Sequence, residues 1–234
     1  MFKKNKLKTV YYVLRIAIFI LLVVSILSIF INHDTDAISR HIFVAAQSVA
    51  LLLLSFGPSY AEKKFKIEIP NFMESIFLLF IIAALLLGEI AEFFVHVSWW
   101  DDMLHTISGL VFTILGFSII NAAVDDPNKK ITLNPIVIAI FVFSFSMTIE
   151  IIWELFEYSV DSLISNSNMM RTVDSITLEP LEGLDAIADT MHDITLTFFS
   201  ALFISVIGFF DNKYHWNLFH RWIIKSSKNK ENIE

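Results

Sequence analysis

Long apolar runs separated by short polar links make up most of this chain. The first run covers residues 10–31 and is interrupted only by Arg15. At about 1.5 Å per residue, a helix of this length crosses the ~30 Å hydrocarbon core of a bilayer. Five similar runs follow, and every proline lies between runs or at a run's end, where helices tolerate it. The pattern predicts six membrane-spanning helices at residues 10–31, 41–57, 72–95, 103–121, 135–158 and 188–210.

Composition supports a membrane protein. Hydrophobic residues make up 56% of the chain and charged residues only 18%, which is too apolar for an ordinary soluble surface. The absence of cysteine excludes disulfide scaffolds and thiolate sites, and a formal net charge of -7 argues against a nucleic-acid partner. We therefore expect an all-α, polytopic protein whose residues 1–234 form a single membrane domain, with a first pair of spans at residues 10–57. Only the link of residues 159–187 is long enough to hold structure of its own.

Lysine and arginine are distributed unevenly over the links. Of the 17 basic residues, only Arg40 and Arg171 lie on the side opposite the chain ends. The others are Lys3, Lys4, Lys6, Lys8, Arg15, Lys63, Lys64, Lys66, Lys129, Lys130, Lys213, Arg221, Lys225, Lys228 and Lys230. Because positively charged links stay in the cytoplasm, we expect both termini to be cytoplasmic in a multi-pass protein of the cell membrane.

Ionisable residues gather at the outer ends of spans three to six. Within each span they repeat every three or four positions, which places them on one face of a helix. The four sets are Glu89, Glu92 and His96; Asp101, Asp102 and His105; Glu150, Glu154 and Glu157; and Asp185, Asp189, His192 and Asp193. A solvated helix end explains Glu89 and Glu92 equally well. We expect the four faces to meet at one level of the bundle, in a cavity open to the extracytoplasmic side.

These ten carboxylates and three histidines are expected to point into the bundle. A charge facing lipid would cost several kcal/mol, about 2.5–3.5 at the centre of a span. Glu150 lies eight residues, or about 12 Å, before the outer end of its predicted span, which makes Glu150 and Glu154 the strongest candidates. So many carboxylates cannot all be ionised without compensation. The site needs protons, a metal ion or a cationic ligand.

Carboxylate and imidazole ligands without thiolates suit Mg²⁺, Mn²⁺ or Ca²⁺, and Zn²⁺ if two histidines bind it. The expected metal ligands are Glu150, Glu154, Glu157, Asp189 and Asp193. A histidine beside a carboxylate can also act as a general acid or base. The expected catalytic residues are Asp101, His105, Glu154, Asp189 and His192.

Aromatic residues and one arginine near the outer interface are the candidate substrate-binding residues. They are Trp100, Trp153, Tyr158 and Arg171. Together with Trp99, the aromatic rings could form a box for a quaternary amine. Tryptophan and tyrosine are enriched at membrane interfaces whatever the function, and this is the simpler interpretation of the aromatic residues.

Three motifs carry a resemblance to known families: WDDMLH at residues 100–105, WELFEY at 153–158 and DTMHDI at 189–194. The chain resembles the YjdF-like inner-membrane proteins and, more distantly, VanZ-like proteins over about residues 89–208. The resemblance matches the family's polar positions to Asp101, His105, Glu154, Glu157, Asp189 and Asp193. The chain departs at Ala188, where relatives usually have tryptophan, and adds His192; these differences leave the choice of substrate open and make an additional histidine ligand possible. A kinship of VanZ-like domains with lipid-headgroup enzymes such as phosphatidylserine synthases would imply headgroup exchange or hydrolysis.

The site is expected to open at the outer headgroup level, and the sequence has no glycine-rich phosphate loop, nucleophile elbow or cysteine nucleophile. We therefore expect metal-assisted hydrolysis or exchange on the headgroup of a phospholipid or polyprenyl-phosphate in the outer leaflet. One alternative is a cation- or proton-coupled transporter, although transporter sites usually lie at the midplane beside broken helices. Another is a non-catalytic protein whose acidic cavity binds a cationic drug, peptide or protein.

The orientation predicts which positions react with a membrane-impermeant thiol reagent added to intact cells. Cysteines introduced at Ser39 and Ser167 should be labelled and one at Ser227 should not, because only the first two positions lie outside. The natural chain has no cysteine, so each signal reports one position. Labelling at position 227 in intact cells would overturn the topology and the outer-leaflet site with it.

Overall fold

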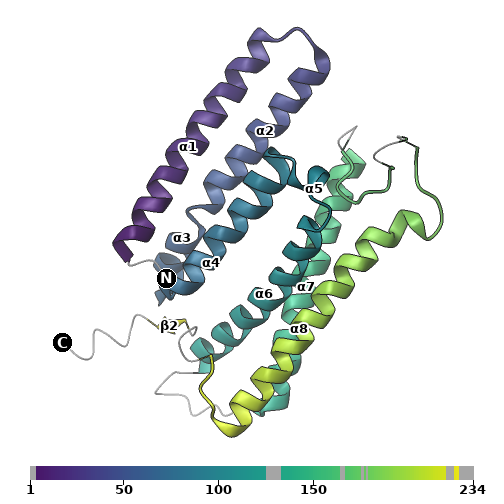
Figure 1. The fold of residues 1–234 in the computed structure, drawn as a ribbon. Coiled ribbons are helices and arrows are strands. Elements are labelled where there is room, and N and C mark those ends of the chain that lie inside the picture. The colour runs from purple at the N-terminus through teal and green to yellow at the C-terminus, as the bar shows by residue number, and fades with distance from the viewer. Residues whose placement is uncertain are drawn as a thin grey trace. The chain divides into compact units, whose positions relative to one another are not determined.

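The structure is a computed structural model that describes residues 4–124, 133–163, 167–174, 177, 179–219 and 224–226. Within these ranges, six helices are long and apolar enough to span a membrane (Figure 1). The prediction of an all-α protein with six spans is therefore confirmed, while the orientation stays a prediction. Several positions used in the orientation argument lie outside the described residues: Lys3, Lys129, Lys130, Arg221, Ser227, Lys228 and Lys230.

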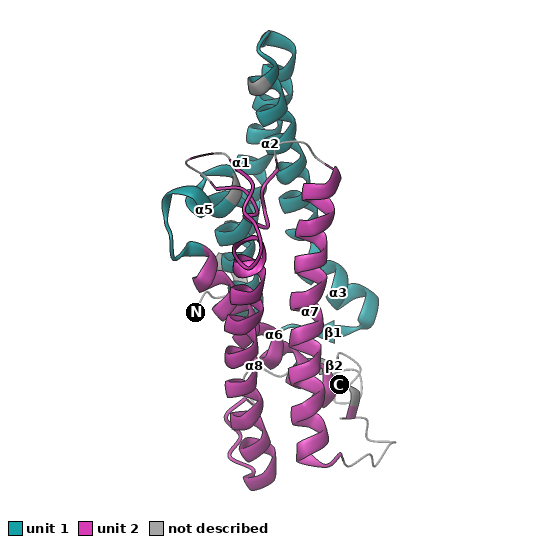
Figure 2. Cartoon of the chain, turned by 90° about the vertical axis from the view of Figure 1, so that its right-hand side faces the viewer, with its two compact units in different colours: residues 1–100, 224–234 teal, residues 101–223 magenta. Residues whose placement is uncertain are grey.

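The chain forms two compact units (Figure 2). Unit 1 comprises Met1–Trp100 and Ile224–Glu234, and unit 2 comprises Asp101–Ile223. Each unit has its own cluster of buried apolar side chains. The single membrane domain expected from the sequence stays a prediction.

Unit 1 contains the first three spans. Its elements are α1 (Lys4–Ile31), α2 (Thr35–Leu54), α3 (Gly57–Phe65), β1 (Ile67–Glu68), α4 (Asn71–Ile81), the π-helix η1 (Ile82–Ile90), α5 (Phe93–His96) and β2 (Lys225–Ser226). The two short strands pair antiparallel. Ile18, Leu51, Leu78 and Ile81 belong to one core cluster, so α1, α2 and α4 share their apolar faces.

Arg15, the one charge inside the first apolar run, is compensated within unit 1. Its guanidinium donates hydrogen bonds to the Ser55 hydroxyl at 3.0 Å and to the Ser55 carbonyl at 2.6 Å. It also lies over the ring of Phe56, 3.8 Å from the ring centroid. A cation–π contact and two hydrogen bonds offset the cost of taking this charge out of water.

The third span is not one regular helix, so the continuous helical face predicted over residues 89–96 is interrupted. Glu92 and His96 still lie close together, with 3.6 Å between Oε2 and Nε2, while the side chain of Glu89 lies outside the described structure. The chain leaves α-helical geometry at η1, where the Ala91 N–H donates to the carbonyl five residues earlier. Glu92 has a left-handed φ of 61°, and the chain turns there into α5. Gly88 permits this turn, because a Cβ at that position would lie 2.4 Å from the ring of Phe94.

Unit 2 contains the last three spans. Its elements are α6 (Trp100–Val124, all but Trp100 in this unit), α7 (Pro135–Leu163), the short 3-10 helix η2 (Asp185–Ile187) and α8 (Ala188–Tyr214). α7 continues five residues past its predicted end, so the link to α8 is shorter than expected. Ile114, Phe117, Val142 and Ile204 form the apolar core where these three helices meet.

Small side chains let the helices of unit 2 approach closely. A Cβ on Gly109 of α6 would lie 2.0 Å from the Ser200 hydroxyl and 3.0 Å from the Thr197 carbonyl, both on α8. The Gly109 carbonyl also accepts a hydrogen bond from the Ser146 hydroxyl of α7 at 3.3 Å. Small residues and interhelical hydrogen bonds are the usual means of helix association in lipid.

This packing predicts that Gly109→Ala destabilises unit 2. The added methyl group meets α8 backbone that cannot move aside, and overpacking of this kind costs about 1–3 kcal/mol. The melting temperature of the purified protein in detergent should fall. Gly57→Ala is the matched control, since the nearest atom to its new Cβ is 3.8 Å away. Equal melting temperatures for the two variants would contradict the packing argument.

Candidate functional site

The buried carboxylates of unit 2 lie along three helices. α6 contributes Asp101, α7 contributes Glu150, Glu154 and Glu157, and α8 contributes Asp193. Each residue is less than a tenth exposed. The regular α-helices keep the predicted spacing, so the three glutamates of α7 share its buried face.

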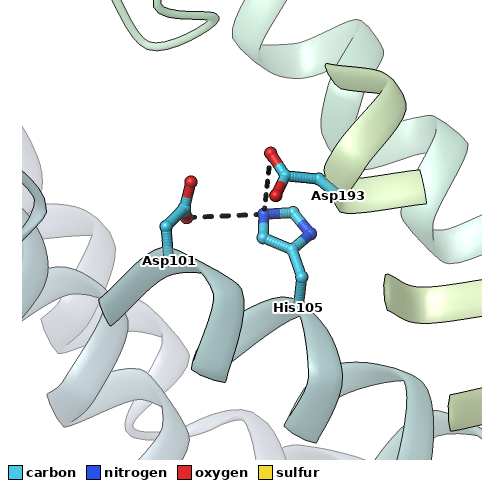
Figure 3. A group of neighbouring side chains, drawn as sticks. All are labelled: Asp101, His105 and Asp193. Carbon is cyan, nitrogen blue, oxygen red and sulfur yellow. Dashed lines mark ion pairs between the residues drawn. The ribbon is translucent and has the colours of Figure 1, made fainter. Parts of the chain in front are cut away.

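The His105 imidazole on α6 lies at the centre of this group. Its Nδ1 is 2.7 Å from Glu150 Oε1. Its Nε2 is 3.5 Å from Asp101 Oδ1 and 3.8 Å from Asp193 Oδ2, as the dashed lines in Figure 3 mark. Thr197 of α8 donates its hydroxyl to the His105 carbonyl at 3.2 Å and so fixes the backbone under the ring. Sequence reasoning missed Thr197, although it lies one helical turn after Asp193 on the same face of α8.

Three buried carboxylate oxygens have no hydrogen-bond partner among the described residues. They are both oxygens of Glu154 and Oδ1 of Asp193. The Thr190 hydroxyl is close to Glu154 but outside hydrogen-bond geometry. Unpaired buried carboxylates are costly unless a proton or a cation compensates them.

Two overlapping groups of side chains have the composition of a metal site. Asp101, His105 and Asp193 form one, and His105, Glu150 and Glu154 form the other. Within each group, one ligand atom from every residue lies within 4.8 Å of the others. The unpaired oxygens of Glu154 and Asp193 belong to these groups, so the residues fit a divalent cation.

Arg171 enters the same cluster from the connection between α7 and α8. Its guanidinium lies 3.1 Å from Asp101 Oδ2 and 3.0 Å from Asp189 Oδ1. Burial alone would lower the pKa of Arg171, but these carboxylates raise that pKa above its ordinary value. The segment just before Arg171 is held against the end of α7. Asp161 of α7 accepts hydrogen bonds from the backbone N–H groups of residues 169 and 170, both at 2.9 Å.

Negative charge predominates in the cluster. Its carboxylates are Asp101, Glu150, Glu154, Glu157, Asp189 and Asp193. Against these six stand Arg171 and the imidazole of His105, which carries at most one positive charge. Protons, a metal ion or a cationic ligand must supply the remaining positive charge.

The remaining predicted residues lie at the rim or elsewhere. His192 is half-exposed and pairs with Asp102, 3.3 Å away, outside both candidate metal groups. Asp185 is exposed. The expectation that ten carboxylates and three histidines point inward was therefore wrong for these residues. Asp102, Asp185 and His192 occupy the first turn of α6 or the start of α8, where the ends of the helices reach water.

The candidate substrate-binding aromatics have separate surroundings. The Trp100 indole N–H donates to the Ala83 carbonyl at 3.2 Å, within unit 1. The Trp153 ring packs against Phe156 with 5.4 Å between centroids, and Tyr158 is 59% exposed. These contacts are those expected of interfacial aromatic residues.

Comparison with known families identifies the family of this chain. A family model described as "Predicted membrane protein (DUF2238)" matches residues 13–214. The chain belongs to this family. The match covers most of the first span, all of the other five and every residue of the His105 cluster. No curated protein and no solved structure matches the chain, so the DUF2238 family description identifies a membrane protein without a reaction.

The ion pairs of Arg171 predict that Arg171→Met destabilises the protein near neutral pH. The substitution leaves Asp101 and Asp189 without their cation, at a cost of about 1–2 kcal/mol for a pair that remains partly exposed. At acid pH, where these carboxylates are protonated in both proteins, the difference in melting temperature should narrow. Arg40→Met is the matched control, because Arg40 makes an exposed pair with Glu92 whose loss costs less than about 1 kcal/mol. An Arg171 effect that does not change with pH would contradict the electrostatic explanation.

Proposed function

We propose that the cluster around His105 binds a divalent metal ion, and that the protein uses this ion to hydrolyse or exchange the headgroup of a phospholipid or polyprenyl-phosphate in the outer leaflet. The observation that carries the proposal is the set of buried, unpaired oxygens on Glu154 and Asp193. A hard divalent cation coordinates such oxygens and removes the cost of burying their charge.

The donor set favours Mg²⁺, Mn²⁺ or Ca²⁺. In one group Asp101 and Asp193 would supply oxygen ligands and His105 one nitrogen, and in the overlapping group the oxygen ligands would come from Glu150 and Glu154. Zn²⁺ would favour a second histidine, but His192 pairs with Asp102 outside both groups. Glu150 orients the imidazole of His105. It is bonded to Nδ1, and this contact fixes the direction in which Nε2 points.

Arg171 indicates an anionic substrate. The guanidinium is about one-third exposed, and its five N–H donors exceed the two ion pairs that it makes. A planar fork of donors beside a metal site is well suited to phosphate oxygens. In this proposal, Asp101 and Asp189 hold Arg171 in place for the phosphate of the headgroup.

A bound divalent ion would polarise a phosphoryl oxygen and lower the pKa of a water molecule. The residues of the chain supply the proton transfers. With Nδ1 bonded to Glu150, His105 would hold the ion through Nε2, so the proton transfers fall to carboxylates of the cluster. In hydrolysis, a water oxygen forms the new bond to phosphorus, the water proton passes to a basic group, and the leaving alcohol departs with a proton.

The resemblance of residues 89–208 to YjdF-like and VanZ-like proteins supports headgroup chemistry. The orientation from lysine and arginine supports the outer leaflet, since the helix ends that carry the cluster lie opposite the basic links. Phospholipids and polyprenyl-phosphates are substrates that reach such a site sideways from the bilayer.

The metal proposal predicts how the removal of one ligand charge changes the thermal stability of the protein and its response to divalent ions. Glu154→Gln keeps the side-chain shape but removes a ligand charge, so stabilisation by a divalent ion should weaken sharply in the variant. If the carboxylates only share protons, the same change relieves repulsion and should raise the melting temperature without any dependence on metal. Melting temperatures of wild type and variant with and without Mg²⁺, Mn²⁺, Ca²⁺ or Zn²⁺, at several pH values, distinguish the two cases. Glu179→Gln, at an exposed position, is the control.

The reaction itself is tested with purified protein, a panel of lipids and the metal that stabilises it, with products identified by mass spectrometry. Headgroup release or exchange that Asp193→Asn abolishes is expected. Metal binding without turnover would reject the enzyme and favour the transporter or the passive binding protein. Flux of the ion into proteoliposomes then distinguishes these two, because a transporter should show flux and a passive binding protein should not.

A further inference from the structure

A second polar site lies at the other end of α8. Asp193 and Asp211 are both buried on this helix and lie 18 residues apart. This separation is five helical turns, so the two carboxylates lie on the same face of α8, about 27 Å apart along its axis. Asp211 is therefore near the opposite membrane interface and belongs to a site separate from the His105 cluster.

Asp211 lines a cavity of about 160 Å³ between the end of α6 and the turn that follows α8. The rings of Phe117 and Phe219 also line it, stacked with their centroids 5.6 Å apart. The cavity is large enough for a small organic molecule but not for a whole lipid.

Only one oxygen of the buried Asp211 carboxylate has a hydrogen-bond partner among the described residues. The Oδ1 atom accepts a hydrogen bond from the Leu218 N–H at 2.8 Å, which closes the turn after α8. The Oδ2 atom has no hydrogen-bond or ion-pair partner among the described residues, although Asp211 is only 9% exposed. This oxygen is open to the cavity, where it can accept a hydrogen bond from a donor or pair with a cation that enters from outside the protein.

The asparagines around Asp211 leave hydrogen-bond acceptors for the cavity. The Asn212 amide N–H₂ donates to the Gly208 carbonyl at 2.9 Å, and that of Asn217 donates to the His215 carbonyl at 3.1 Å. Both side chains line the cavity, and their Oδ1 atoms make no hydrogen bond to a described residue. The lining is thus rich in acceptors.

The described basic residues at the cavity do not form an ion pair with Asp211. His215 lines the cavity and makes no such pair. Lys213 lies over the rings of Phe209 and Tyr214 instead, with its ammonium nitrogen 5.5 and 5.3 Å from their centroids. A metal ion is also poorly served, because Asp211 belongs to none of the candidate metal groups found among the described residues.

We propose that this cavity binds the ammonium group of a small primary amine, held by Asp211 Oδ2 and the oxygens of Asn212 and Asn217. A primary ammonium carries three N–H donors and no acceptor, which complements an acceptor-rich lining. The stacked rings of Phe117 and Phe219 give the cavity an apolar side for the carbon atoms of the amine. The amine comes either from solution or from the headgroup of an amine-bearing lipid at this interface.

The test is a calorimetric titration of the full-length protein in detergent with ethanolamine. Wild type should bind it, and Asp211→Asn should weaken binding at least tenfold, about 1.4 kcal/mol. This variant keeps an Oδ1 acceptor for the Leu218 N–H, so the turn should survive. Asn121→Ala removes another polar side chain of the lining, one that makes no hydrogen bond of its own in the described structure, and it too should weaken binding. Glu179→Gln should bind ethanolamine as wild type does.

Three further probes separate the outcomes. Tetramethylammonium, which has no N–H donor, should bind more weakly than ethanolamine, and inorganic phosphate should not bind. Nanodiscs with phosphatidylethanolamine should stabilise wild type more than Asp211→Asn if the source is a lipid, whereas equal melting temperatures in phosphatidylethanolamine and phosphatidylcholine would assign the site to a free amine. No ethanolamine binding by wild type, or equal binding by Asp211→Asn, would overturn the proposal and leave the His105 site untouched.

Discussion

Compensation of buried negative charge is the constraint on which unit 2 depends. The three helices cannot bring their acidic faces together unless cations come with them, because a carboxylate away from water costs several kcal/mol without a partner. The protein supplies the His105 imidazole from within the bundle and the Arg171 guanidinium from the connecting segment. The unpaired oxygens that remain define what the site still requires.

The same atoms hold the helices together and shape the site. Thr197 bonds the His105 carbonyl, and one turn farther along α6 the backbone of Gly109 approaches α8 closely enough to exclude any side chain. The distances between the His105 imidazole and the surrounding carboxylates therefore depend on how closely the helices pack. A substitution that separates α6 from α8 would alter the centre without touching any of its charged groups.

Much of this arrangement follows from sequence spacing, and the exceptions have physical causes. Long apolar runs predict the six spans, and helical periodicity places Glu150, Glu154 and Glu157 on one buried face. Periodicity assumes an unbroken α-helix, so it failed near Gly88, where the chain passes through a π-helix and a left-handed Glu92 and the ring of Phe94 packs on the glycine. Periodicity also does not indicate how deeply a residue is buried in the bundle. The half-exposed Asp102 and His192 therefore could not be distinguished from the buried Asp101 and Asp193. Asp211 gave no signal, because its role depends on a turn that closes only in three dimensions.

α7 has consequences for how the protein enters the membrane. Between its three buried glutamates, the helix exposes Ile151, Ile152, Leu155 and Phe156 on its outer surface. The outward residues favour lipid, while each inward carboxylate would cost up to about 2.5–3.5 kcal/mol in a helix released alone into the bilayer, most for those nearest the centre. Independent partitioning of this segment is therefore unfavourable until α6 and the Arg171 segment cover its acidic side. Biogenesis of the protein must delay the lateral release of α7, or keep its acidic face in a hydrated channel, until the rest of the chain has been synthesised.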